Sequence, residues 1–171
     1  ENTGEIEAAE QNKIPRLLEE KDLRGVFHTH TVYSDGANSV KEMAESARRL
    51  GFEYIGISDH SQSAFYAHGM KEEDLKRQQR EIDGLNKEFK GFRIFRGVES
   101  DILADGSLDY PSKILTQFDF IIASVHGQFN MSKSAMTKRI IRAIQNKYTT
   151  MVGHLTGRLL LARSEYELDI G

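Results

Sequence analysis

The sequence predicts an α/β protein with a parallel sheet, and three observations support this fold class. Apolar runs of strand length alternate with longer segments of helical periodicity along the 171 residues. The spacing between successive apolar runs is roughly 30 residues, the length of one βα unit. Each run ends at or beside a histidine or a glutamate. Alternation of this kind is typical of βα units that build one parallel sheet.

The strands and helices can be placed from these patterns. We expect five strands, at residues 26–30, 54–58, 92–98, 118–125 and 150–153. Between them we expect helices at residues 40–50 and 71–90, a short helix after Pro111, and a helix at 132–146. Ser39 and Glu42 form a capping box at the start of the first helix. In the last helix, we expect Met136, Ile140, Ile141 and Ile144 to face inward.

The ends of the chain differ in composition from its middle. Residues 1–23 are polar and charged, and we expect a linker or N-terminal extension that could include a short helix. Residues 24–171 form the predicted domain. The chain begins at Glu1, and residues 165–171 look like the start of a helix, so we interpret the sequence as part of a longer chain.

Composition excludes several classes of protein. The chain is 39% hydrophobic and 29% charged, as in a globular domain, and its net charge of -3 gives no general attraction to polyanions. The apolar runs are too short to cross a membrane, and no signal peptide is evident, so a cytoplasmic location is the default expectation. The absence of cysteine excludes disulfides and leaves only nitrogen and oxygen ligands for a metal.

The first strand carries the most informative motif, His28-Thr29-His30. Side chains at positions i and i+2 of a strand point the same way, so both imidazoles can face one point. Asp35 lies in a Ser-Asp-Gly turn and can fold back toward them. Two imidazoles and a carboxylate make a partial shell for a divalent metal, although an isolated pair of this kind is more often a solvated strand end.

The pattern recurs at the other strand ends, which lie on one edge of a parallel α/β sheet and are expected to converge. Taken singly, His126 and His154 could be core histidines and Glu99 could be a helix cap. Taken together, the set predicts a metal centre. The expected ligands are His28, His30, Asp35, His60, Glu99, His126 and His154.

Seven ligands exceed the coordination of one tetrahedral zinc, so we expect two or three divalent ions. The histidine-rich shell favours Zn, Mn or Fe over Mg. Neighbouring cations of this kind suit the hydrolysis of a phosphate ester. We expect Glu99, Asp35 and His60 to carry the catalysis, with Glu99 able to bridge two ions. Asp59 is expected to orient an imidazole from outside the ligand shell.

Other polar residues have weaker assignments. Arg158, Arg163 and His68 could bind the substrate, although a surface histidine is the plainer interpretation of His68. Asp101 and Asp105 are interpreted as turn formers. A basic run could follow a nucleic-acid backbone, but a solvated face is favoured because acidic helices balance the charge. This run contains Lys133, Lys138, Arg139, Arg142 and Lys147.

Six motifs in order resemble those of the PHP (polymerase and histidinol phosphatase) family. They are His28-x-His30, Ser34-Asp35-Gly36, Ser58-Asp59-His60, Gly97-Val98-Glu99-Ser100-Asp101, Ser124-Val125-His126 and Gly153-His154. The likeness runs from about Asp22 to the last residue. The segments 4–9, 105–109 and 157–160 further resemble the C-terminal PHP domain of bacterial family X DNA polymerases.

The resemblance implies a distorted (β/α)7 TIM-like barrel, of which this chain carries roughly the first five βα units. It also implies a trinuclear metal site at the strand ends and, for the polymerase subgroup, a 3′-5′ exonuclease that processes DNA ends, with a polymerase domain N-terminal to it. Two departures stand out. Val26 replaces a frequent acidic residue, and the late Asp-x-His motif and the last two barrel units are absent from the sequence. A sheet cut there is expected to expose an apolar edge.

Three functions remain open at this point. The first is a phosphoesterase acting on DNA 3′ ends. The second is a phosphatase for a phosphorylated small molecule, such as histidinol phosphate. The third is a non-catalytic module that is stabilised by metal. The linker-like N-terminus favours the first function over the second, and the set of ligands disfavours the third.

Overall fold

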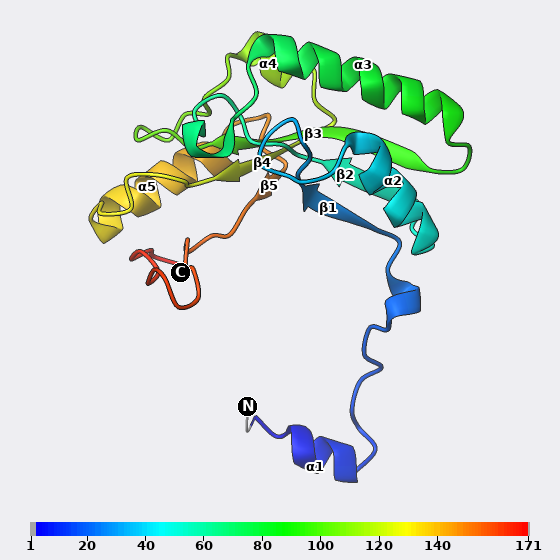
Figure 1. The fold of residues 1–171 in the computed structure, drawn as a ribbon. Coiled ribbons are helices and arrows are strands. Elements are labelled where there is room, and N and C mark those ends of the chain that lie inside the picture. The colour runs from blue at the N-terminus through cyan, green and yellow to red at the C-terminus, as the bar shows by residue number, and fades with distance from the viewer. Residues whose placement is uncertain (1–2, 171) are drawn as a thin grey trace.

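The computed structural model describes residues 3–170 and contains a five-stranded sheet with the strand order β1-β2-β3-β4-β5. The strands are β1 (Gly25–Thr29), β2 (Tyr54–Ile57), β3 (Arg93–Asp101), β4 (Phe120–Ser124) and β5 (Met151–Val152). Every neighbouring pair is parallel, and the sheet curls into an open half-barrel (Figure 1). The predicted fold class and the five predicted strands are therefore confirmed.

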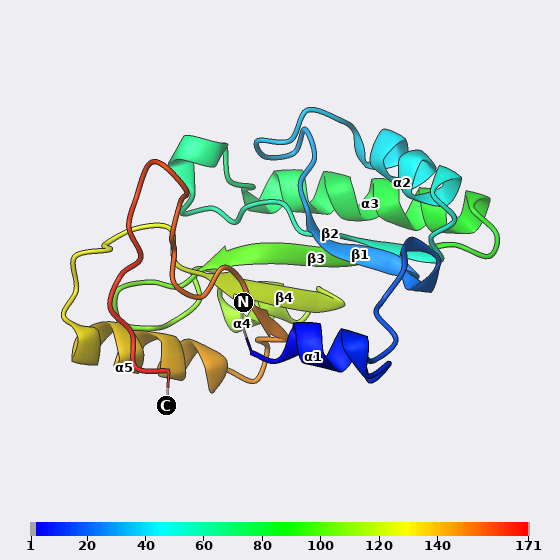
Figure 2. The ribbon, with the colours of Figure 1, turned by 90° about the horizontal axis from the view of Figure 1, so that it is seen from below.

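Helices precede the first strand and lie between successive strands. They are α1 (Glu5–Glu10), α2 (Val40–Arg49), α3 (Glu72–Glu88), α4 (Ser112–Leu115) and α5 (Lys133–Ile144), with 3-10 turns η1 (Glu20–Asp22) and η2 (Phe65–Ala67). In Figure 2, α2 and α3 lie on the side of β1 and β2, and α5 lies beyond β4. The predicted capping box of α2 is present, with Ser39 and Glu42 bonded to each other's backbone. Among residues 3–170, no helix is both long and apolar enough to cross a membrane.

Two apolar clusters hold the helices to the sheet. Ala44 of α2 and Ile82 of α3 pack with Ile57 of β2 in one cluster, and all three are fully buried. Ile121 of β4 and Met136 of α5 belong to the other, which also includes α4. Because each full burial of such a side chain contributes about 1.5–3 kcal/mol, these clusters fix the strand ends where the polar side chains emerge.

Aromatic rings fill the inner face of the curled sheet. The ring of Phe27 in β1 lies edge-on to that of Phe120 in β4, with 4.8 Å between centroids. This approach requires glycine on the strands between them. A Cβ atom at Gly56 would lie 2.2 Å from the Phe27 ring, and one at Gly97 would lie 2.1 Å from the Phe120 ring. The glycines let distant strands share one core.

Two expectations about the elements were wrong. The third strand does not end at residue 98, because Glu99 and Asp101 still pair in register with Ile122 and Ser124. The predicted helix start at 165–171 is not observed, since residues 164–170 have no regular structure and Gly171 lies outside the described residues. In the N-terminal extension, residues 3–23 contain α1 and η1, and residues 1–2 are likewise outside the described part.

Helix α5 buries a different face from the one predicted. Met136 and Ile140 are buried, but Ile141 is 46% exposed and Ile144 is 52% exposed. Arg139 takes the buried place and is only 4% exposed. The apolar residues alone predict the wrong buried face, because Arg139 lies among the core-facing positions of the helix.

Backbone carbonyl groups take the place of water around the buried guanidinium of Arg139. It donates to the carbonyl oxygens of Leu103 at 2.9 Å and Gly127 at 3.0 Å, and also to that of Ile102. Burial lowers the pKa of Arg139. This arginine therefore fastens α5 to the loops after β3 and β4 and does not belong to a solvated basic face.

The two edge strands are unpaired on their outer sides within residues 3–170. Val26 in β1 and Val152 in β5 are each 36% exposed. An apolar edge was predicted for a sheet of five strands, and these side chains are part of it.

Candidate metal centre

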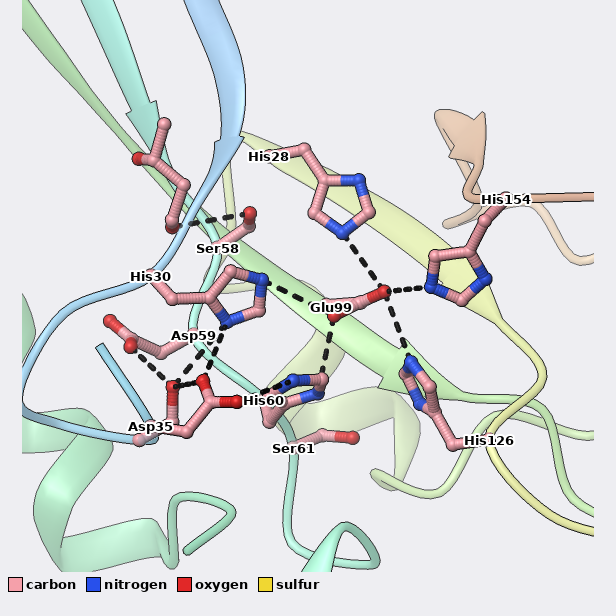
Figure 3. Close-up of polar contacts among 12 residues, drawn as sticks. His28, His30, Asp35, Ser58, Asp59, His60, Ser61, Glu99, His126 and His154 are labelled. Atoms are coloured by element: carbon pink, nitrogen blue, oxygen red, sulfur yellow. Dashed lines mark hydrogen bonds and ion pairs between the residues drawn. The ribbon is translucent and has the colours of Figure 1, made fainter. Parts of the chain in front are cut away.

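The structure brings all seven predicted ligands to one place, at the C-terminal ends of the strands (Figure 3). Glu99 lies at the centre, with its side chain 1% exposed. Five imidazole rings point at its two carboxylate oxygens. Oε1 lies 2.9 Å from His28 Nε2, 3.2 Å from His126 Nε2 and 3.0 Å from His154 Nε2, and Oε2 lies 3.2 Å from His60 Nδ1 and 3.4 Å from His30 Nε2.

The two histidines of the first motif reach Glu99 in a different way from the one predicted. His28 has φ of 63°, a left-handed conformation, and the register of β1 against β2 shifts there. His30 lies beyond the end of β1. The irregular backbone, and not the alternation of a regular strand, therefore aims both rings at the same carboxylate.

Room for the His28 ring depends on Gly153. A Cβ atom at Gly153 would lie 3.2 Å from His28 Cε1 and 2.2 Å from Ser124 Oγ. Glycine immediately before His154 thus lets the tips of β1, β4 and β5 approach each other.

Asp35 returns to the cluster through a tight turn. The backbone N–H groups of Ser34 and Gly36 both donate to the carbonyl of Thr31, at 3.0 and 2.9 Å. Asp35 Oδ1 then lies 3.5 Å from His30 Nδ1, and Oδ2 lies 3.7 Å from His60 Nε2. Asp35 is 46% exposed and forms the open side of the site.

His60 is placed by a continuation of the sheet. Beyond the end of β2, Glu99 N donates to Asp59 O at 3.1 Å and Ser61 N donates to Glu99 O at 3.0 Å. His60 therefore lies directly beside Glu99 on the neighbouring strand.

The donor set fits divalent cations. Three overlapping groups have ligand atoms within 4.8 Å of one another, and they are His28-Glu99-His154, His30-Asp35-His60 and His60-Glu99-His126. The buried Nδ1 of His60 faces Glu99 but has no hydrogen-bond partner among residues 3–170. A bound cation would satisfy this nitrogen and the crowded carboxylate together.

The pKa values of the side chains in this cluster are shifted in different directions. Burial alone favours a protonated Glu99, but hydrogen bonds from His126, His154 and His28 outweigh it and hold the pKa of Glu99 well below its usual range. Burial lowers the pKa of His60. Burial also disfavours the charged form of His126, yet its hydrogen bonds with Asp101 and Glu99 raise the pKa of His126 to about 9. Glu99 is therefore held as a carboxylate, while the surroundings favour the neutral form of His60 and the protonated form of His126.

Asp59 lies outside this shell, as predicted for it, but it contacts the loop and not an imidazole. The carboxylate is fully buried and accepts hydrogen bonds from Thr31 N at 2.7 Å, Ser34 Oγ at 2.6 Å and Gln78 Nε2 at 2.6 Å. Ser34 Oγ is in turn 3.5 Å from His30 Nδ1. Asp59 thus fixes the loop that follows His30.

Asp101 contacts the candidate site, and the sequence interpretation did not include it among the site residues. Its Oδ1 lies 2.5 Å from His126 Nδ1. A carboxylate can only accept here, so Nδ1 carries the proton and Nε2 is left facing Glu99. The sequence pattern ends the third strand at residue 98 and so places Asp101 in a turn, whereas the strand continues to Asp101. Its spacing of two residues from Glu99 was the available signal.

The predicted substrate-binding residues are not in contact with the ligands. His68 is exposed and follows η2 with φ of 54°. Arg158 is exposed, and the exposed Arg163 donates to Gly157 O at 3.0 Å and lies over the ring of Phe129 at 3.8 Å. Their roles stay predictions.

Comparison with known proteins identifies relatives of this chain. The family model of the PHP domain matches residues 27–168. The chain is 46% identical over 154 residues to the DNA polymerase/3'-5' exonuclease PolX of Bacillus subtilis, a match that covers 90% of this chain and 27% of that protein. It is 32% identical over 138 residues to a "Probable phosphatase" of Caldanaerobacter subterraneus, covering 74% of this chain and 50% of that protein. The chain thus spans half or less of the length of these relatives.

A solved structure shows the same fold. The crystal structure of histidinol phosphate phosphatase from Lactococcus lactis, complexed with zinc, L-histidinol and phosphate, superimposes with a TM-score of 0.55. The match covers 78% of this chain and 58% of that chain at 23% identity. Fold, motif order and family model agree, and the chain belongs to the PHP domain family.

Proposed function

We propose that the chain is the PHP domain of a metal-dependent phosphoesterase, with two or three divalent ions (Zn, Mn or Fe) held by the seven residues around Glu99. The observation that carries this proposal is the buried Glu99 carboxylate with five imidazole nitrogens within 3.4 Å. The bound ions would supply a water of lowered pKa and positive charge for the phosphate oxygens.

The chain's own residues would have distinct tasks in this reaction. Glu99 offers two oxygens on opposite sides, which suits it to hold two neighbouring ions at a fixed separation. His60 lies between Glu99 and Asp35 and links the buried part of the site to its open side. Asp35 is the exposed carboxylate of the set and is placed to accept a proton from an attacking water.

For the substrate, we propose the 3′ end of DNA, processed as a 3′-5′ exonuclease. The 46% identity to PolX over 90% of this chain supports this assignment. The polymerase domain would precede residue 24 in the whole protein, with residues 1–23 as the connecting segment. Arg158, Arg163 and His68 are the candidates for contacts with the nucleic acid.

A second candidate is a phosphatase for a phosphorylated small molecule. The similarity to proteins described as phosphatases and the fold shared with histidinol phosphate phosphatase favour it. Both candidates use the same metal chemistry and differ in what is attached to the phosphate. A module that holds metal only for stability is the third candidate, and an absence of hydrolysis with metal bound would support it.

One experiment separates these candidates. The purified protein is incubated with Mn²⁺ or Zn²⁺ and either a 5′-labelled DNA primer or histidinol phosphate. Shortening of the primer from its 3′ end supports the exonuclease. Phosphate release from histidinol phosphate without primer shortening supports the small-molecule phosphatase. Hydrolysis of neither substrate by protein that demonstrably contains metal would refute the phosphoesterase proposal.

A further inference from the structure

Two exposed aromatic side chains lie at the rim of the candidate metal centre. Phe65 and Tyr66 sit side by side in η2, the short turquoise coil in Figure 2, and are 85% and 65% exposed. The Tyr66 ring is 5.8 Å from the His60 ring and 6.0 Å from the His126 ring, measured between centroids. Tyr66 therefore borders the ligand cluster, and Phe65, the residue before it, faces solvent.

The backbone of this turn is fixed on both sides. Ala64 is fully buried and Ala67 is 1% exposed, so the residues that flank the aromatic pair are packed into the protein. Gly69 lies so close to the preceding loop that a Cβ atom would be 1.9 Å from Ser61 O. The segment is thus anchored by packing, and the exposure of the two rings is a property of an ordered turn.

Hydrogen bonds tie the same segment to the loop after β3 and to the backbone of His60. Ser63 N donates to Asp109 Oδ2 at 2.9 Å, and Met70 N donates to His60 O at 2.8 Å. The position of the rings is therefore coupled to the backbone that carries His60. A rigid placement of this kind is what a specific contact with a ligand requires, because little ordering entropy is lost on binding.

An aromatic ring beside a phosphoester site can stack on a flat group attached to the phosphate. Phenylalanine and tyrosine stack on nucleobases irrespective of base identity. Sites for single-stranded nucleic acid use such aromatic stacking faces.

We propose that Phe65 and Tyr66 form a stacking surface for the base of the nucleotide that carries the scissile phosphate. The inference rests on the proposed phosphoesterase function and narrows its substrate to a nucleotide or a nucleic-acid end. Tyr66 stacks on the side of the metal centre, and Phe65 extends the surface toward solvent. Recognition of this kind is independent of base sequence.

The test compares a labelled single-stranded DNA with an oligomer of equal length whose 3′-terminal residues are abasic. Binding is measured by fluorescence anisotropy in the presence of Mn²⁺, and hydrolysis is followed separately on the same samples. The variants are Phe65→Ala, Tyr66→Ala and the conservative Phe65→Tyr. Leu50→Ala is the matched control, since Leu50 is 65% exposed at the C-terminal end of α2, away from the strand tips.

We expect each alanine variant to weaken binding of normal DNA by about five- to a hundredfold, the range for loss of one stacked base. Binding of the abasic oligomer should change by less than about twofold on that same account. Phe65→Tyr and Leu50→Ala should match the unchanged protein, and metal content should be the same in all variants. Equal losses on both oligomers, or no loss on either, would overturn the stacking proposal. Absence of hydrolysis by the unchanged protein would count against the phosphoesterase function alone, because the binding comparison would still decide on stacking.

Discussion

His126 and His154 occupy equivalent places at the ends of β4 and β5, yet the protein holds them differently. Their Nε2 atoms lie 3.2 and 3.0 Å from the same oxygen of Glu99. The His126 side chain is 10% exposed, and Asp101 binds its other nitrogen at 2.5 Å. The His154 side chain is 44% exposed, and within residues 3–170 it contacts Glu99 and the rings of His28 and His126. The two histidines are therefore similarly close to Glu99, but among the described residues only His126 is held by a second side chain, Asp101. We call this second contact the brace.

The comparison shows that the orientation of a histidine ring before metal binding depends on the group that holds its second nitrogen, and not on the histidine alone. A ring held on both nitrogens loses no rotamer freedom when a metal binds, whereas an exposed ring must be ordered. His126, on the buried side of the site, is therefore held in place before a metal binds, whereas the more exposed Asp35 and His154 form its open side.

Removal of the shared carboxylate should have the largest effect, because both histidines converge on it. Glu99→Gln should lower hydrolysis by more than the roughly 10–100-fold that outer-partner changes typically cost. The rate with Mn²⁺ is the measurement. Glu88→Gln, at an exposed position of α3, is the matched control and should be unchanged. Retention of full activity by Glu99→Gln would exclude it from the site.

The two histidines should differ when each is removed. His126→Ala should weaken metal binding more than His154→Ala, because the braced ring contributes without a cost in ordering. Competition with a chromophoric chelator measures the affinity of each variant for Zn²⁺. An equal loss in the two variants, or a larger one in His154→Ala, would contradict the comparison.

Removal of the Asp101 brace should leave His126 held by Glu99 alone, as His154 is. Asp101→Ala should lower Zn²⁺ affinity by about 10–100-fold, and Asp101→Asn should lower it less, since an amide oxygen can still accept from Nδ1. Asp105→Ala is the control, because Asp105 is exposed and bonds Ser107 and Arg142. If Asp101→Ala binds zinc as tightly as the unchanged protein, the brace has no role in binding.

Asp109 is another buried or nearly buried carboxylate, and it differs from Glu99 and Asp101 because its hydrogen-bond partners are neutral groups and not histidines. Asp109 is 9% exposed and accepts from Ser63 N and Ser100 Oγ, and burial raises its pKa. A raised folded-state pKa gives stability that is present at acid pH and lost as pH rises through that value. Asp109→Asn should therefore gain stability relative to the unchanged protein between pH 4 and pH 7. Urea unfolding of metal-free samples measures this, and a difference independent of pH would argue against a buried charge.

Much of this arrangement could be predicted from the sequence. Strand and helix positions follow from periodicity because burial on one face repeats every two or 3.6 residues. The cluster follows from the position of His60, Glu99, His126 and His154 after apolar runs, because parallel strands end on one edge.

The remainder depends on tertiary contacts that no local pattern contains. The left-handed backbone at His28 is set by the packing of the strand tips around Gly153. Arg139 was expected on a solvated face, but it is buried because carbonyl groups from two loops meet its guanidinium. The position of the Asp101 side chain depends on whether β3 continues past Glu99. Only the pairing of β3 with β4 decides this.

Anomalous scattering from crystals grown with Zn²⁺ tests the central claim most directly, because it locates the ions without reference to activity. The account predicts anomalous peaks beside Glu99, with at least one within about 2.0–2.2 Å of imidazole nitrogens and a carboxylate oxygen. Crystals of Glu99→Gln should lose these peaks. Zinc found only at surface histidines such as His68, with the Glu99 pocket vacant at saturating metal, would contradict the account.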